Sequence, residues 1–135
     1  LGYISQHPEH IGLICPMIDA RRMEVYAAIF DNNGNCIRPT SADIITESIY
    51  DEWLADKNIF FIGDGADKTR SLLENKNNVS FDTDFKISAT GMATIAEELY
   101  SKHKFEDIAY FEPFYLKDFV AAKPSVKGLK SISVR

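Results

Sequence analysis

The sequence predicts a mixed α/β fold in which a three-stranded antiparallel meander leads into alternating helices and strands. Two adjoining runs, residues 12–19 and 24–31, are rich in β-branched and aromatic side chains, which is typical of strands. After residue 40, apolar residues at helical spacing alternate with short, continuously apolar runs. We therefore expect a mixed sheet with helices packed on it.

The meander is expected to continue through a tight turn into a third strand. Residues 31–35 read Asp-Asn-Asn-Gly-Asn, and an Asn-Gly pair is a strong hairpin signal. Residues 36–38 then predict a short strand that ends at Pro39. Pro16 lies inside the first strand and cannot donate to a ladder, so that strand is expected at a sheet edge or bulged there.

The second part of the chain alternates between the two kinds of element. Ile45, Ile49 and Trp53 share one face at helical spacing and predict a helix. Residues 59–62 form a continuous apolar run, typical of a strand covered on both faces, and a helix through Leu73 should follow.

The last part should hold a short strand, one clear helix and an irregular end. The strand is expected at residues 79–81, and residues 110–116 are aromatic and contain proline, which favours an extended segment. The helix is defined by apolar residues at helical spacing: Met92, Ile95, Ala96, Leu99 and Tyr100. From residue 120 onward no periodic apolar face exists, so a loose tail is expected.

Composition points to a single water-soluble domain. Among the 135 residues, 45% are hydrophobic and 26% charged, and no apolar run approaches the roughly 20 residues of a membrane helix. Cys15 and Cys36 lie in apolar runs without metal-ligand spacing, which favours reduced thiols and a cytoplasmic location over a disulfide. Because the chain begins with Leu1 rather than Met, we expect it to be a piece of a longer protein.

The charge is unevenly distributed. The net charge is −5, yet residues 1–118 carry 11 basic and 20 acidic side chains. Such an acidic body disfavours nucleic-acid binding across the domain, because phosphate contacts need a positive surface. The tail holds basic residues and no acid after Asp118, so Lys123, Lys127 and Lys130 are candidates for RNA or partner contact, with a merely solvated tail as the alternative.

Four charges fall within six residues at the junction of the first two strands: Asp19, Arg21, Arg22 and Glu24. Charges at a hairpin end stay hydrated at little cost, and a bidentate pair of Asp19 with either arginine could fix the turn. A catalytic role would need a nucleophile or base beside them, and the turn contains no Ser, Cys or His. A structural or partner-contact role is therefore favoured.

A glycine-containing junction follows the strand at residues 59–62. Gly63, Gly65 and Ala66 are weak nucleotide-proximal candidates, since such junctions can bring backbone N–H groups to a phosphate. The pattern lacks the third glycine of a dinucleotide-binding motif because position 68 is Lys, and Asp64 would repel a phosphate. A plain strand-to-helix turn is the favoured interpretation.

His7-Pro8-Glu9-His10 superficially suggests a metal site. Metallopeptidase helices place their histidines four residues apart, and Pro8 argues against such a helix here. No third ligand is apparent from the sequence, so we expect no metal site. The residues together contain no self-sufficient catalytic set.

Three stretches, read together, resemble the C-terminal half of the bacterial TsaB (YeaZ) family. They are MIDARRMEVYAAIFD at residues 17–31, FFIGDGADK at residues 60–68 and FEPFYLKDFVAAK at residues 111–123. The sequence ATGMATIAEELYSKHK at residues 89–104 lies where that family has its last long helix. The resemblance extends over nearly the whole chain from about residue 11.

The resemblance implies an actin-like ATPase (ribonuclease H-like) domain. It places that domain at residues 11–119, after a linker at residues 1–10 from a missing N-terminal domain and before a basic flexible tail at residues 120–135. It implies a non-catalytic scaffold that supports its paralogue TsaD, together with TsaE, in threonylcarbamoyl transfer to tRNA adenosine. It implies indirect contact with tRNA, no membrane, no metal, no cofactor of its own, and ATP or ADP at most at an interface of the full complex. A homodimer of the full-length protein is also consistent with the resemblance.

The alternative is an actin-like enzyme that binds or hydrolyses nucleotide at the glycine junction. Older descriptions of the family as glycoproteases (peptidase M22) rest on metal-binding histidines of TsaD, and His7 and His10 do not reproduce their pattern. The chain also departs from the family at Met23, where many relatives have Gly, and in lacking the N-terminal half.

Overall fold

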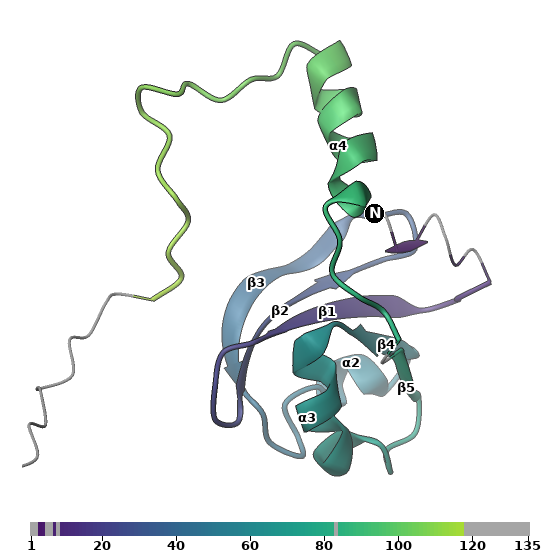
Figure 1. Ribbon diagram of the computed structural model, residues 1–135. Coiled ribbons are helices and arrows are strands. Elements are labelled where there is room, and N and C mark those ends of the chain that lie inside the picture. The colour runs from purple at the N-terminus through teal and green to yellow at the C-terminus, as the bar shows by residue number, and fades with distance from the viewer. Residues whose placement is uncertain (1–2, 5–6, 8, 83, 118–135) are drawn as a thin grey trace, which may run out of the picture.

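The computed structural model describes residues 3–4, 7, 9–82 and 84–117, and shows one mixed sheet of five strands in the order β3-β2-β1-β4-β5 (Figure 1). The strands are β1 (Leu13–Asp19), β2 (Glu24–Phe30), β3 (Cys36–Ile44), β4 (Ile59–Ile62) and β5 (Val79–Asp82). β1, β2 and β3 pair antiparallel, whereas β4 is parallel to both β1 and β5. The predicted α/β class, with its meander, is confirmed.

In the described part of the chain, three helices lie between and after these strands: α2 (Asp51–Leu54), α3 (Asp64–Leu73) and α4 (Thr90–Ser101). The predicted order of elements is confirmed, but α2 is shorter than the spacing of Ile45, Ile49 and Trp53 indicated. Ile45, the first residue of the expected helix, is instead bound to the turn between β1 and β2, because its amide donates to the Met23 carbonyl (2.8 Å). Within the described ranges, no helix has the length and apolar character needed to cross a membrane.

The third strand continues through Pro39, contrary to the prediction that it ends there. β3 is an edge strand, so a missing N–H does not break pairing on both sides. Ile29 pairs with Arg38 and Ala27 with Ser41, so two residues of β3 oppose one residue of β2. Pro39 therefore lies in a β-bulge, one of the places where a sheet accepts proline.

Pro16 lies in β1, which is a central strand, so the prediction of an edge position was wrong. The β1–β2 register pairs Ile14 with Phe30 and Met17 with Ala27, and it skips Pro16 without changing. On the other side, Pro16 pairs with Ile62 of β4. The sheet thus accommodates the missing N–H of Pro16 by a local interruption of the pairing between β1 and β2.

The main core lies between the sheet and α2 and α3. Phe61, Met17 and Ile29 are almost completely buried on this face, and α3 contributes Leu73 and Thr69. Burying an apolar side chain of this size contributes about 1.5–3 kcal/mol. This face therefore supplies most of the hydrophobic stabilisation of the domain.

A buried polar network ties β3 to the segment before α2. Asp43 accepts hydrogen bonds from Arg38 (2.5 and 3.2 Å), from the Ser41 hydroxyl (2.7 Å) and from the Tyr50 hydroxyl (2.8 Å). Burial opposes ionisation of Asp43, but these hydrogen bonds outweigh it and lower the pKa of its carboxyl. The sequence pattern did not identify Asp43 as an interior residue.

The opposite face of the sheet carries a second, smaller cluster. Tyr3 is buried with Ile14 and Ile62, and Phe60 and Phe85 pack against them. Residues at the start of the chain, predicted as a linker from another domain, thus contact the sheet. The linker assignment itself stays a prediction.

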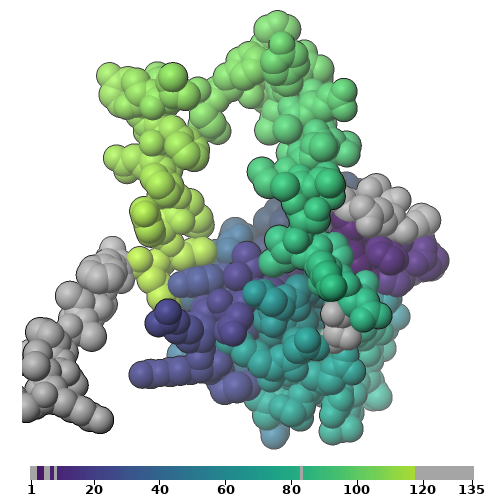
Figure 2. Space-filling view, viewed as in Figure 1, coloured from purple at the N-terminus to yellow at the C-terminus, as the bar shows by residue number. Residues whose placement is uncertain are grey.

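The last helix does not pack on the sheet as predicted. None of the residues of α4 is buried, and the helix extends away from the domain (Figures 1 and 2). The segment after it exposes large apolar side chains, and Figure 2 shows an open gap between α4, this segment and the domain. Residues 111–115 have no helix, as their composition indicated.

Both cysteines are free thiols, but only one is buried. Cys15 lies inside β1, and its burial raises the pKa of the thiol to about 12. Cys36 is exposed at the start of β3, although its apolar neighbours had suggested an interior strand.

Candidate functional site

The turn between β1 and β2 has a strained backbone. Arg21 and Arg22 have positive φ angles of 69° and 50°, which cost L-residues other than Gly, Asn and Asp about 1–2 kcal/mol each. The Asp19 carboxylate accepts the Arg21 backbone N–H (2.7 Å), and the Ala20 amide donates to the Glu24 carbonyl (3.1 Å). Asp19 thus fixes the turn through the backbone, not through the guanidinium pair that the sequence suggested.

The amino-terminal part of α3 completes this hairpin end. The Lys68 ammonium donates to the Asp19 carboxylate and to the Glu24 carbonyl. This hydrogen bond, followed by that from the Arg21 amide, lowers the pKa of Asp19. The Asp64 carboxylate accepts the Asp19 backbone N–H (3.2 Å). The hairpin end and the glycine junction, predicted separately, therefore form one site.

The two junction glycines are in close contact with β1. A Cβ at Gly63 would lie 2.4 Å from the Met17 carbonyl oxygen, and Gly63 has a φ of 95°. A Cβ at Gly65 would lie 3.0 Å from backbone atoms of Met17 and Ile18. Ala66 is fully buried. Close packing of a helix against a strand thus accounts for these small residues without a nucleotide.

A shallow pocket of about 330 Å³ lies beside this junction. It is lined by Gly63, Asp64, Asp67, Phe85, Lys86 and Ile87. Two carboxylates and one ammonium face it, so its charge disfavours a polyphosphate.

The exposed side of the hairpin end combines positive and apolar side chains. Arg21 and Arg22 are exposed, and Ile18 and Met23 expose 52% and 40% of their surface. Such exposed arginines beside apolar residues resemble the composition of interface patches.

The segment around Lys117 reaches the same surface. Its ammonium pairs with the Glu24 carboxylate, and Phe114 and Tyr115 line a pocket with Ile18 and Tyr26. Residues 111–117, the described part of the third stretch that carried the family resemblance, therefore meet the first stretch, residues 17–31, in space.

The predicted charged residues are thus brought together with partners that the sequence did not indicate. Lys68 and Lys117 lie 49 and 93 positions from their carboxylate partners, Asp19 and Glu24, and no local pattern links them. In the described ranges, the polar contacts of the four charged residues involve no Ser, Cys or His. The three candidate tail residues, Lys123, Lys127 and Lys130, lie outside the described residues.

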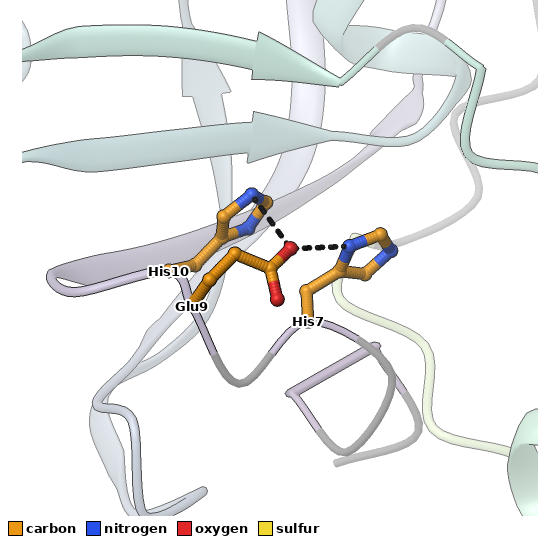
Figure 3. A group of neighbouring side chains, drawn as sticks. All are labelled: His7, Glu9 and His10. Carbon is orange, nitrogen blue, oxygen red and sulfur yellow. Dashed lines mark hydrogen bonds and ion pairs between the residues drawn. The ribbon is translucent and has the colours of Figure 1, made fainter.

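The two histidines near the start of the chain do gain a third neighbouring ligand group. The Glu9 carboxylate lies 3.2 Å from His7 Nδ1 and 3.7 Å from His10 Nε2 (Figure 3). The sequence did not indicate that Glu9 would lie close to both imidazoles, and the expectation of no metal site stays a prediction. A turn, with the His10 amide donating to the His7 carbonyl (3.1 Å), brings the side chains together.

The fold defines the class: a mixed five-stranded α/β domain consistent with the actin-like, ribonuclease H-like architecture. A solved structure with this fold is that of an uncharacterized protein with similarity to peptidase YEAZ from Pseudomonas aeruginosa. The two superpose with a TM-score of 0.64 over 85% of this chain, at 17% identity, a level that shows a shared fold only. The present chain spans about half (54%) of that protein. No family model and no curated protein matches the sequence.

Proposed function

We propose that this chain is a TsaB-like, non-catalytic scaffold that acts in the cytoplasm. In this role it binds and activates TsaD, works with TsaE, and supports threonylcarbamoyl transfer to tRNA adenosine without contributing a reacting group. ATP or ADP would bind only at an interface of the full complex. The observation that carries the proposal is the hairpin end, where two exposed arginines are held in a strained backbone beside apolar side chains.

The Asp19 carboxylate is better suited to a binding role than to acid–base catalysis. Asp19 is engaged by Lys68 and has a lowered pKa, which makes it a poor proton acceptor near neutral pH. Backbone strain persists only where surrounding contacts enforce it, and such strain is concentrated at functional positions. A rigid turn that presents two guanidinium groups suits recognition of an acidic partner surface.

The Arg22→Gly variant separates binding from folding. Glycine relieves the positive φ, so the free energy of unfolding should rise by about 0.5–1 kcal/mol, measured by urea denaturation. Loss of the guanidinium should weaken binding to TsaD about tenfold or more, measured by isothermal titration calorimetry.

Lys57→Ala is the matched control, because it removes one exposed positive charge next to Asn58, which contacts the start of β1 rather than its end. This variant should bind TsaD like the unmodified chain. Equal affinity of both variants would remove the hairpin end as the contact surface. A failure of the unmodified chain to bind TsaD would overturn the proposal.

The alternative, a nucleotide-binding enzyme, is tested by titrating ATP into the chain alone. Tight binding that Lys86→Ala abolishes would place nucleotide in the pocket beside α3 and contradict the scaffold role. Lys86→Ala is the suitable variant, since substitutions at Gly65 would disturb its packing on β1. We expect no ATP binding without TsaD, and no peptide hydrolysis with or without Zn²⁺.

A further inference from the structure

We propose that His7, Glu9 and His10 bind a divalent transition-metal ion of the zinc class beside strands β4 and β5. This site lies apart from the hairpin end and does not depend on the proposed scaffold role.

The three side chains converge in a single turn. Their ligand atoms all lie within 4.8 Å of one another, and the Glu9 carboxylate lies between the two imidazoles (Figure 3). The rings are stacked at 5.0 Å between centroids with an angle of 11°. Because parallel rings do not direct their lone pairs to one point, coordination by both requires one ring to turn. His7 is the ring that would turn, with a change in its packing on Tyr3 (4.4 Å between centroids), because its side chain is one-third exposed.

The donor set matches the chemistry of zinc. Two imidazoles and one carboxylate form a recurring three-ligand zinc set that leaves a fourth position open. Imidazole also suits copper and nickel, whereas calcium and magnesium prefer oxygen ligands.

A second layer of contacts orients His10. The Tyr3 hydroxyl lies 3.0 Å from His10 Nδ1, and the imidazole stacks on Phe60 at 4.2 Å with an angle of 7°. A hydrogen bond at Nδ1 leaves Nε2, the nitrogen that faces Glu9, to bind metal. Orienting partners of this kind are typical of histidine ligands.

An acidic pocket of about 260 Å³ adjoins the cluster. Its polar lining consists of His7, His10, Ser80, Asp82 and Asp84, and Phe60 and Phe81 complete it. No lysine or arginine of the described residues lines this pocket. The surrounding carboxylates therefore favour a cation, and the pocket leaves room for a water molecule at the fourth position.

Metal binding would fix the turn at residues 7–10, which lies beside the smaller cluster on the sheet. Tyr3 already packs on Ile14 and Ile62, and Asp82 is the final residue of β5. A ligand that binds only the folded state stabilises it by an amount that grows with the logarithm of the ligand concentration relative to Kd. The unfolding temperature of the chain should therefore rise with added Zn²⁺.

The test uses the 135-residue chain, freed of metal by chelator and titrated with Zn²⁺ by calorimetry. Co²⁺ serves as a spectroscopic probe, because its visible absorption reports the number and type of ligands. We expect one ion per chain and a loss of affinity of at least about 100-fold in His7→Ala, His10→Ala and Glu9→Gln. Tyr3→Phe, which removes only the orienting hydroxyl, should weaken binding about 10- to 100-fold and keep the stoichiometry.

His103→Ala is the matched control. His103 is the third histidine of the chain, exposed just after α4, and its removal should leave affinity unchanged. The circular dichroism spectrum of each variant verifies that it folds, and Glu9→Gln preserves side-chain size where an alanine variant does not fold. Binding that persists in His7→Ala and His10→Ala, or that is lost in His103→Ala, would overturn the proposal in favour of adventitious surface coordination.

Discussion

Gly63 shows how a single residue sets the packing of the candidate site. It connects β4 to α3 at a φ of 95°, with the Met17 carbonyl oxygen where a side chain would begin. The sequence identified the glycines but offered two explanations, nucleotide approach and a plain turn. Only the position of β1, which is distant in sequence, gives the packing explanation its physical basis.

Gly63→Ala should lower the free energy of unfolding by about 2–4 kcal/mol, the combined cost of backbone strain and overpacking. The change is measured as a shift of the urea midpoint. Gly91→Ala is the control, because a Cβ there meets nothing within 4 Å and alanine favours the helix. It should not lower stability; equal losses in both variants would contradict the packing argument.

Asp43 should make stability depend on pH. Its folded pKa lies below the unfolded value of about 3.9, so its contribution is present above that pH and is lost as pH falls through the folded pKa. Asp43→Asn should cost roughly 2 kcal/mol at pH 7, since three donors lose a charged acceptor. Urea denaturation between pH 7 and pH 2 should show the wild type and the variant converging at the acid end.

Asp56→Asn is the companion control for this measurement. Asp56 is exposed in the turn after α2, so its substitution should change stability by no more than about 0.5 kcal/mol at any pH. If the free energies of unfolding of the wild type and Asp43→Asn differ by the same amount at every pH, the lost contacts are not those of an ionised carboxylate.

Among the elements, α4 differs most from expectation. Its apolar periodicity correctly predicted a helix, but periodicity cannot identify the surface against which an apolar face packs. Met92, Leu99 and Tyr100 are 68%, 42% and 71% exposed. The same limit applies to β3, where proline alone predicted an end that the bulge at the sheet edge avoids.

The exposure of α4 predicts fast local opening. A helix of 12 residues with no buried side chain is marginally stable in water, whereas α3 opens only when the core does. Amide hydrogen exchange followed by mass spectrometry should show α4 exchanging at least about 100-fold faster than α3. Equal protection of the two helices would mean that α4 is buried in solution.

At the scale of the whole molecule, charge separation suggests a role for the basic tail. Residues 1–118 are strongly acidic, and the remaining residues carry only positive charges. If Lys123, Lys127 and Lys130 contact phosphates, removal of residues 123–135 should reduce the salt dependence of tRNA binding by the TsaD-containing complex. The slope of log K against log salt should decrease in magnitude by up to about 2–3.

A variant with all three lysines changed to arginine keeps the charge and should keep the slope. Filter binding at a series of salt concentrations measures both proteins. An unchanged slope after truncation would identify the tail as solvated chain.

The sequence alone determined the types and order of the elements, the Asn-Gly turn and the glycine junction, because each depends on neighbours within a few residues. Tertiary structure decided which of these meet: Lys68 with Asp19, Lys117 with Glu24, and Tyr3 with His10. These contacts depend on strand order and on how the helices pack, which are set by burial across the whole chain. Local patterns carry no information about such distant partners. The sequence therefore identified the candidate residues but not the side chains that surround them.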